Sequence, residues 1–430
     1  MSPGLPAEPA RLAARQGLAY GLLGLPLAFV ALPLVVLMPP HYAGEYGMPL
    51  ASLGALLLAV RALDAVLDPW IGRRVDRVLG WPPRARLGAA ALAALLLALA
   101  FRALFFPPVR EPAALLAWAG LALVGCYLGY SALGVLHQAW GAALGGEPGY
   151  RARVVAWREG AALAGVVVAS LLPPLAGLAV TSTVLALALA LGLLALAHAP
   201  TPASGVPGGH TAAVDLWQPW RQAAFRRLLL VYLLNGVASA LPATLVLFFV
   251  RDRLQWPAGE PWVLGTYFAA AALSLPLWVR LVVRVGLARA WAGGMALAVV
   301  TFVGAAGLGA GDGAWFLLVC AASGCALGAD LCAPAALLAG VLRSERTGPA
   351  GAPAAGVAFG WWSAATKLNL ALAAGVALPL LQALGYQPGQ ADPAGTLALA
   401  QVYALLPCAL KALALAALWA LWIRRKDLSS

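Results

Sequence analysis

Long apolar runs alternate with short clusters of proline, glycine and charged residues along the whole 430-residue chain. A membrane-spanning helix needs about 20 consecutive, mostly apolar residues. Segments of that length lie in two sets, one on each side of a longer polar stretch. The first set is 16–40, 47–71, 86–108, 113–144, 153–175 and 178–199, and the second is 225–252, 260–284, 288–311, 313–342, 355–385 and 396–423. We therefore predict an all-α integral membrane protein with twelve transmembrane helices.

The longer polar stretch, Thr201–Gln222, separates two halves that resemble each other. Pro69 and Arg73 after the second span have counterparts in Pro276 and Arg280 after the eighth. Two homologous six-helix halves with a substrate cavity between them are typical of secondary transporters. Two unrelated bundles with a chance match of proline and arginine are the alternative. The predicted parts are an N-terminal six-helix bundle (1–200), a cytoplasmic linker (201–222) and a C-terminal six-helix bundle (223–430).

Composition agrees with a membrane protein, because only 10% of the residues are charged, whereas a soluble domain carries roughly a quarter. The net charge of +12 comes from basic residues in short bursts between the spans. Such bursts indicate membrane topology and not a nucleic-acid surface. Their distribution predicts a multi-pass protein of a bacterial-type inner (plasma) membrane with both termini in the cytoplasm, which we expect to function as a monomer. We expect no cleavable signal peptide, and the five cysteines lack metal-ligand spacing.

Three charged residues interrupt the second span, namely Arg61, Asp64 and Asp68. Their spacing of three and four residues places them on one face of a helix. A charge at the centre of a bilayer costs at least ~2.5–3.5 kcal/mol, so such residues must be paired or face a wet cavity. Neighbouring carboxylates can share a proton, bind a cation or pair with an arginine. We predict a cation-coupling site here, with a static Arg61–Asp64 bridge that only pins the bundle as the alternative.

Other polar residues within the spans are candidates for the substrate cavity. Lys367 in span eleven needs an acidic or anionic partner, for which Asp330 in span ten is the obvious choice. The pair is either a substrate or coupling contact or a structural one. His137 either lines the cavity or packs as a hydrogen-bonded histidine, and Trp362 is a candidate for an aromatic cavity wall. We interpret Lys411 as a snorkelling or helix-packing residue.

The segment after span two reads GRRVDR and covers Gly72–Arg77. Gly72 permits a close helix approach, Asp76 can accept hydrogen bonds from a neighbouring helix terminus, and Arg77 stays on the cytoplasmic side. We interpret the segment as a conformational gate; the alternative is a positively charged loop and nothing more. The sequence contains no nucleophile–base motif, HExxH or phosphate-binding Gly-Lys loop. We therefore predict neither enzyme activity nor a cofactor.

Several of these segments together resemble the glycoside–pentoside–hexuronide:cation symporters of the major facilitator superfamily, whose best-known member is the melibiose permease. The likeness extends over nearly the whole chain. Its most specific piece is RALDAVLDPWIGRRVDR, which contains the pattern R-x-x-D-x-x-x-D-P-x-x-G. The other pieces are YSALGVLHQAWGAAL, YRARVVAWREG, GADLCAPAALLAGV and WWSAATKLNLALAAG. The resemblance implies two pseudo-symmetric six-helix bundles and symport by alternating access.

The resemblance also implies a cation site. Asp64 and Asp68 match the paired carboxylates that bind the coupling cation, and Arg61 matches the arginine beside them. Ser131 falls where a hydroxyl helps the site. Leu67 stands where sodium-using relatives can supply an amide oxygen, which favours protons over sodium as the coupling ion.

For the substrate, the resemblance implies a binding region that includes Arg158. Tyr130, next to Ser131, is a further candidate for the substrate cavity. Lys367 matches a lysine linked to both the cation and the substrate sites. The acids that grip sugar hydroxyls in relatives appear here as Ala28 and Gly134. The coupling residues are therefore largely kept, while the sugar-binding acids are not.

We predict a symporter, driven by protons or sodium, that carries a small organic solute such as a sugar or glycoside. A lysophospholipid or another amphiphile is the alternative cargo, which the apolar replacements suit. A transporter-shaped sensor or scaffold is a further alternative, although no large soluble domain exists to carry a signal. A membrane enzyme is the remaining class, and it lacks catalytic residues.

Overall fold

The computed structural model describes residues 12–202, 215–346, 355–386 and 392–424, so part of the predicted linker at 201–222 lies outside the described residues. Within these ranges the chain forms helices and no strands. Contacts divide the chain into two units: Met1–Pro219 with Leu342–Ala364, and Trp220–Val341 with Ala365–Ser430. We call them unit 1 and unit 2. The sequence-based domain limits stay a prediction.

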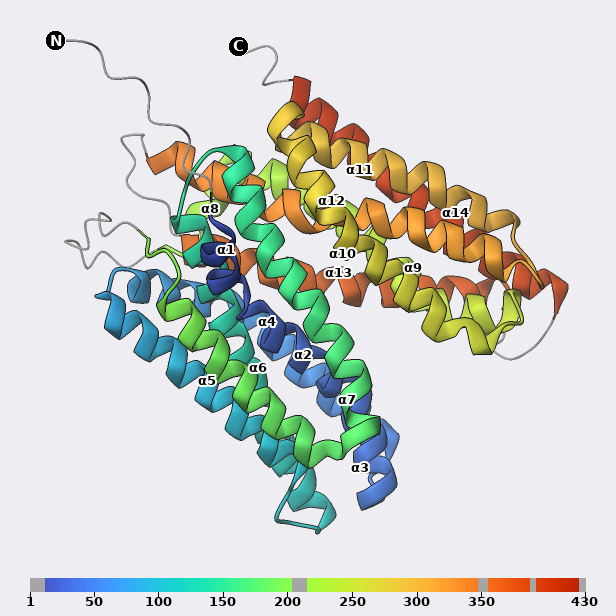
Figure 1. Cartoon of the computed structure of the whole chain (residues 1–430). Coiled ribbons are helices and arrows are strands. Elements are labelled where there is room, and N and C mark those ends of the chain that lie inside the picture. Colours follow the sequence, from blue (N-terminus) through green and yellow to red (C-terminus); the bar gives the residue numbers. More distant parts are fainter. Residues whose placement is uncertain (1–11, 203–214, 347–354, 387–391, 425–430) are drawn as a thin grey trace. The chain divides into compact units, whose positions relative to one another are not determined.

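Unit 1 consists mainly of seven helices, which carry blue to green colours in Figure 1. They are α1 (Ala14–Gly21), α2 (Gly24–Leu32), α3 (Met38–Tyr46), α4 (Leu50–Leu79), α5 (Pro83–Phe105), α6 (Pro112–Ala143) and α7 (Pro148–Ala197). Proline is favoured in the first turn of a helix, where its missing N–H is not needed, and α5, α6 and α7 each begin with one. α7 contains two predicted spans, separated by a break at Gly177, whose φ of 78° suits glycine.

Most of the remaining helices belong to unit 2. They are α8 (Gln218–Arg221), α9 (Ala223–Phe248), α10 (Glu260–Val285), α11 (Leu287–Phe302), α12 (Gly313–Arg346), α13 (Ala355–Ala383) and α14 (Pro393–Leu418). The last residues of α12 and the first turns of α13 belong to unit 1. α13 is therefore one continuous helix that is shared by both units.

The predicted all-α membrane fold is confirmed. Eleven helical segments among the described residues are long and apolar enough to cross a membrane. The twelfth is α4, whose 30 residues extend over about 45 Å at about 1.5 Å per residue and carry the charges noted above. Large apolar side chains such as Leu92, Leu121 and Leu191 are 69%, 71% and 58% exposed, as expected of a surface that faces lipid.

Small residues let the helices of unit 1 approach closely. A Cβ atom on Gly165 of α7 would lie 2.1 Å from the carbonyl oxygen of Leu25 on α2. α4 packs on α6, and α6 packs on α5. These contacts hold α2, α4, α6 and α7 together, and the candidate residues of unit 1 project from these helices and from α1.

Aromatic rings form the centre of unit 2. The rings of Phe249 and Tyr403 are stacked with centroids 4.3 Å apart, and Phe316 packs against Phe249 at 5.1 Å. α14 packs on both α9 and α11. Tyr403 therefore occupies a fixed position on α14, from which its hydroxyl reaches the interior of the unit.

Candidate functional site

The two aspartates of α4 are almost completely buried. Asp64 is 3% exposed and Asp68 0%. Ser131 of α6 is itself 2% exposed, and its Oγ donates a hydrogen bond to Asp64 Oδ1 at 2.8 Å. The structure thus brings together Asp64 and the hydroxyl that the resemblance placed at the cation site. Their role in coupling stays a prediction.

Further polar residues surround this acidic pair in unit 1. Tyr130, next to Ser131 on α6, lies within electrostatic range of Asp64, Asp68, Arg61 and Glu159. Arg61 is half-buried. Because Glu159 projects from α7, the polar zone runs from α4 across α6 to α7 inside a single unit.

Tyr20 and His137 join α1 to α6 through two reciprocal hydrogen bonds. The Tyr20 hydroxyl donates to the carbonyl oxygen of His137 at 2.9 Å, and His137 Nε2 lies 2.8 Å from the carbonyl oxygen of Tyr20. A carbonyl oxygen only accepts, so Nε2 must carry the proton. The side chain of His137 is 1% exposed. This geometry corresponds to the hydrogen-bonded packing histidine, one of the two interpretations of the sequence.

Arg158 of α7 is neutralised by its neighbour in the chain. Its Nη2 and Nε donate to Glu159 Oε1 at 2.5 Å and 3.0 Å, and the two side chains are 12% and 21% exposed. Arg158 also lies within electrostatic range of Tyr20 and His137. On α6, a Cβ atom on Gly134 would meet no other atom within 4 Å. The position at which the resemblance implies a sugar-binding acid is thus open space.

Asp76, near the C-terminal end of α4, caps the N-terminus of α13. Its Oδ1 accepts a hydrogen bond from the N–H of Gly356 at 2.6 Å, and its Oδ2 accepts one from Val357 at 2.9 Å. Burial raises the pKa of Asp76 to about 7, against the effect of these two bonds. The structure therefore provides the helix terminus that the sequence suggested for Asp76. Its function as a gate stays a prediction.

Glycines bring the two helices into backbone contact beside this cap. A Cβ atom on Gly72 would lie 2.1 Å from the carbonyl oxygen of Gly356, and one on Gly360 would lie 2.4 Å from that of Asp68. The backbone of the cation candidate Asp68 thus touches α13 directly. On α13, Trp362 is 4% exposed, and Lys367 is half-buried one turn beyond it. Arg77 is exposed at the end of α4.

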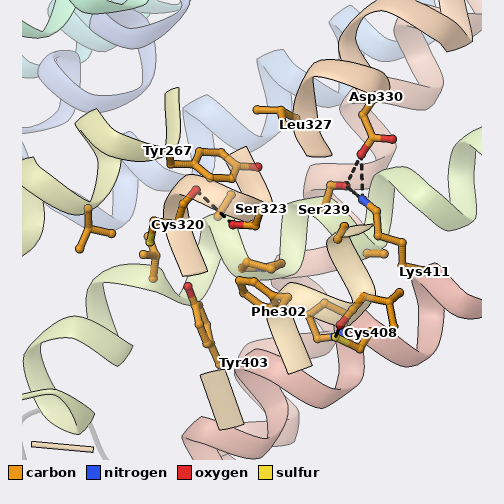
Figure 2. A pocket seen from close by; sticks show the side chains of 18 of the residues that line it. Ser239, Tyr267, Phe302, Cys320, Ser323, Leu327, Asp330, Tyr403, Cys408 and Lys411 are labelled. Carbon is orange, nitrogen blue, oxygen red and sulfur yellow. Dashed lines mark hydrogen bonds and ion pairs between the residues drawn. The ribbon is translucent and has the colours of Figure 1, made fainter. Parts of the chain in front are cut away.

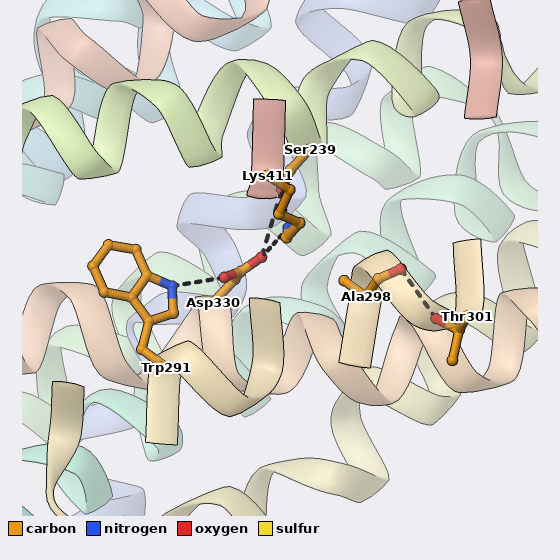
Figure 3. Close-up of polar contacts among 6 residues, drawn as sticks. All are labelled: Ser239, Trp291, Ala298, Thr301, Asp330 and Lys411. Carbon is orange, nitrogen blue, oxygen red and sulfur yellow. Dashed lines mark hydrogen bonds and ion pairs between the residues drawn. The ribbon is translucent and has the colours of Figure 1, made fainter. Parts of the chain in front are cut away.

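The structure corrects two expectations about Asp330 on α12. Its Oδ2 accepts from Lys411 Nζ of α14 at 2.8 Å, and its Oδ1 accepts from Trp291 Nε1 of α11 at 2.8 Å (Figure 3). The partner of Asp330 is thus Lys411 and not Lys367. Of the two alternatives for Lys411, snorkelling is wrong, because the side chain is 10% exposed and also donates to Ser239 Oγ at 2.9 Å. The helix-packing alternative agrees with these contacts, which join α14 to α12 and α9. Asp330 points toward α11 and α14, a direction set by how α12 packs.

The ion pair lines one end of a cavity of about 240 Å³ that lies entirely within unit 2 (Figure 2). α9, α10, α11, α12 and α14 contribute its walls. Most of the wall is apolar, with Val246, Phe268, Phe302 and Leu327 among its members. The hydroxyl of Tyr403 is at the end opposite the ion pair, whereas that of Tyr267 points toward Asp330 and lies within its electrostatic range.

These features, twelve membrane helices with buried charges and without a catalytic arrangement among the described residues, are those of a transporter. The sequence matches the family described as MFS/sugar transport protein over residues 17–425. The chain belongs to this family. It is therefore a multi-pass secondary transporter of the major facilitator superfamily that works in a lipid bilayer on a small-molecule substrate.

Solved structures show the same fold of this superfamily. A bacterial homologue of the iron transporter ferroportin in an outward-facing state has a TM-score of 0.70 and 19% identity, covering 95% of this chain and 99% of that one. The human organic anion transporter MFSD10 (TETRAN) has a TM-score of 0.62 and 20% identity, covering 96% and 100%. The Escherichia coli fucose:proton symporter FucP has a TM-score of 0.61 and 12% identity, covering 93% and 98%. No curated protein sequence matches this chain significantly.

Sequence reasoning about this major facilitator protein missed the polar residues of unit 2 that accompany Asp330. Trp291 and Ser239 carry no charge and are common within apolar spans, so nothing in their sequence context marks them. Lys411 did carry a signal, because two opposite charges in neighbouring apolar spans must each be compensated. The rotational orientation of α12 and α14, which decides the pairing, depends on packing.

Proposed function

We propose that this transporter is a symporter in which a proton binds at the Asp64/Asp68 pair. Family membership supports secondary transport, and one observation supports proton binding at the pair. Two carboxylates one helical turn apart are 3% and 0% exposed within a membrane helix. The hydrogen bond from Ser131 fixes the position of the Asp64 carboxylate.

The electrostatics of the pair favour loading by a single positive charge. Residues four apart on a helix lie about 6 Å from each other. At that separation two negative charges repel by about 3 kcal/mol at an effective dielectric constant of about 20. One bound proton removes this repulsion and also the cost of holding a second charge in the membrane. Protonation therefore changes the energy of α4 at the place where Asp68 contacts α13.

A proton fits the surroundings of the pair better than sodium does. Sodium requires several oxygen ligands, whereas a proton needs one carboxylate. Leu67, which lies between the two aspartates in the sequence, brings no oxygen.

A sugar or glycoside is the proposed cargo, as in the glycoside–pentoside–hexuronide:cation symporters. The family description supports a sugar, and the fold is shared with a fucose:proton symporter. The open space at Gly134 and the absence of an acid at Ala28 favour an amphiphile, such as a lysophospholipid, as the second candidate. We propose a bacterial-type inner membrane, cytoplasmic termini and a functional monomer.

Within this proposal, Asp76 acts as the gate. Its carboxyl group caps the first turn of α13, the helix that both units share. Release of the cap frees the first turns of α13 from α4. Loading of Asp68, whose backbone touches Gly360, alters the same α4–α13 contact.

The test is thermal unfolding of the purified protein in mild detergent between about pH 5 and about pH 9, with sodium titrated against choline. Asp64→Asn and Asp68→Asn are compared with the wild type. Asp76→Asn is measured as well, because Asp76 titrates near pH 7 and its share of the response has to be subtracted. We expect a pH-dependent unfolding temperature, of which Asp76→Asn removes only a part, a remaining response that either coupling variant reduces, and no saturable sodium effect.

Two results would contradict the proposal. A saturable sodium stabilisation that both variants abolish would place a sodium site on α4. A pH response that disappears only in Asp76→Asn would assign the titration to the α13 cap and leave the acidic pair without a role in coupling. Intact uptake in Asp64→Asn, once a substrate is found, would favour a function that does not depend on the acidic pair.

A further inference from the structure

The cavity of unit 2 contains hydrogen-bond donors whose capacity the described chain does not use. Tyr403 is 2% exposed and lines the cavity, and its hydroxyl makes no hydrogen bond to any described residue. The same holds for the hydroxyl of Tyr267. Lys411 carries three N–H groups and has two acceptors, Asp330 and Ser239. At least three donor positions thus face one enclosed space.

The carboxylate of the cavity, in contrast, already accepts hydrogen bonds through both oxygens. Asp330 Oδ1 accepts from Trp291 and Oδ2 from Lys411, and Ser239 Oγ accepts from Lys411 (Figure 3). The Oγ of Ser323 donates to the carbonyl oxygen of Val319 at 2.7 Å. Donors on Tyr403, Tyr267 and Lys411 therefore remain for a ligand that offers acceptor atoms.

The dimensions and lining of the cavity restrict the ligand further. Tyr403 and Lys411 are eight residues apart on α14, which corresponds to about 12 Å along a helix. Figure 2 shows Phe302 between Tyr403 and the ion pair of Asp330 and Lys411. A volume of about 240 Å³ and that length suit a molecule of about two rings. Its body must be apolar, because the wall between the two ends offers a sugar few partners for its hydroxyls.

The ion pair also decides the charge of the ligand. Asp330 and Lys411 neutralise each other at 2.8 Å with side chains that are 10% exposed. An anionic ligand beside them would place a second negative charge near Asp330, and a cationic one would compete with Lys411. An uncharged acceptor, such as a carbonyl oxygen, can take the remaining N–H of Lys411 or a tyrosine hydroxyl without either cost.

We propose that this cavity is a second binding site, distinct from the acidic pair of α4, for an uncharged, mainly apolar molecule that carries a carbonyl-type hydrogen-bond acceptor. The site goes beyond the proposed symport, and it stands whether or not protons drive transport. It lies within one unit, so it does not require any particular arrangement of the two units. Exposed Ala243 and Leu264 on α9 and α10 mark where the ligand enters.

Benzophenone is a suitable probe, because it has two rings, one carbonyl oxygen and no charge, and it cross-links to nearby C–H groups under illumination. The purified full-length protein in lipid nanodiscs is illuminated with benzophenone, digested, and mapped by mass spectrometry. We expect labels on cavity-lining residues of α9, α12 and α14. Acetophenone should reduce this labelling, whereas benzoate, ethylbenzene and sorbitol should not.

Two variants test the assignment. Ala298→Phe fills the cavity from α11 and should abolish labelling there, while Ala269→Phe, at an exposed position of α10 outside the cavity, should leave it unchanged. Tyr403→Phe removes a hydroxyl that has no partner among the described residues, so the fold should tolerate it. Loss of one hydrogen bond to the ketone should weaken labelling roughly fivefold. Should Ala298→Phe fail to fold, Tyr403→Phe carries the test.

Three outcomes would overturn the inference. Labels confined to lipid-facing positions, with equal intensity in Ala298→Phe, would show that the cavity does not bind the probe. Equal competition by ethylbenzene would show that no acceptor is required, and stronger competition by benzoate would indicate an anion site. Each of these readouts is independent of proton coupling, so failure here leaves the proposed symport untouched.

Discussion

Replacing Lys411 with methionine would remove the cation that Asp330 faces inside unit 2. Methionine keeps much of the length and apolar volume of lysine but carries no charge. Both side chains of the pair are 10% exposed, so water would screen the uncompensated carboxylate of Asp330 little. Removal of one partner of a buried ion pair typically costs about 3–5 kcal/mol of the free energy of unfolding. Hydrogen bonds from Trp291 and Ser239 remain in the variant and keep the loss within that range.

The double variant Asp330→Asn/Lys411→Met separates the ion pair from the loss of side-chain contacts. It leaves no uncompensated charge, and asparagine can still accept from Trp291 Nε1. The single variant Asp330→Asn completes the cycle. We expect the double variant to lie within about 2 kcal/mol of the wild type, so that its loss is smaller than the sum of the two single losses, as for other residues in direct contact. Thr301→Val is the control, because the Thr301 hydroxyl donates only to carbonyl oxygens of its own helix (Figure 3).

Equilibrium unfolding in mixed micelles, with sodium dodecyl sulfate added to dodecyl maltoside and helicity followed by circular dichroism, measures these energies. Additive losses in the double variant would refute the reasoning, because independent effects would mean that the two charges do not compensate each other. A loss below about 1 kcal/mol in Lys411→Met would refute it as well, since that is the size expected for an exposed pair.

The remaining predictions concern unit 1. Gly72→Ala should cost about 1–3 kcal/mol of unfolding free energy, because its Cβ would lie 2.1 Å from a carbonyl oxygen. Gly54→Ala on the same helix is the control: its Cβ meets no atom within 4 Å, so the variant should gain up to about 1 kcal/mol. An equal effect in both variants would exclude the close α4–α13 contact. Burial raises the pKa of Asp76 from an ordinary value near 4 to about 7, so between those values the folded protein holds a proton that the unfolded chain releases. The contribution of Asp76 to stability therefore falls as the pH rises through that window, and Asp76→Asn should flatten the curve of unfolding free energy against pH there; an unchanged slope would contradict this. His137→Phe should cost about 1–3 kcal/mol, because it leaves the buried carbonyl oxygen of Tyr20 without its donor, and an unaltered unfolding curve would show that the bond does not contribute.

Much of the fold follows from hydropathy alone, because the bilayer requires every span to satisfy its own backbone within about 20 residues. Apolar runs and the polar stretch around 201–222 were sufficient for twelve spans in two sets. The boundary predicted between residues 175 and 178 brackets Gly177, at which α7 breaks into two spans. That break depends on one positive φ angle, which glycine permits but does not require.

Residues of the site were predictable where they lie on one helix or within a recognised motif. Asp64 and Asp68 share a face because of their spacing, and Ser131 was placed beside them by resemblance. The partner of Asp330 was not predictable, because Lys411 and Lys367 carry the same charge. Which of them pairs with Asp330 depends on how each helix is rotated about its axis. Tyr403 gave no signal, since an aromatic residue in an apolar span is usually core.

The titration of the acidic pair on α4 is the most direct test of the account. Infrared difference spectroscopy of the protein in nanodiscs follows the carbonyl stretch of protonated carboxyl groups as the pH changes. The measurement uses an Asp76→Asn background, so that the α13 cap contributes no band. We predict a pH-dependent carboxyl band in this background that disappears or shifts in both Asp64→Asn and Asp68→Asn, and that sodium does not displace. A band that persists unchanged in both variants, or the absence of any titrating band, would contradict proton coupling at α4.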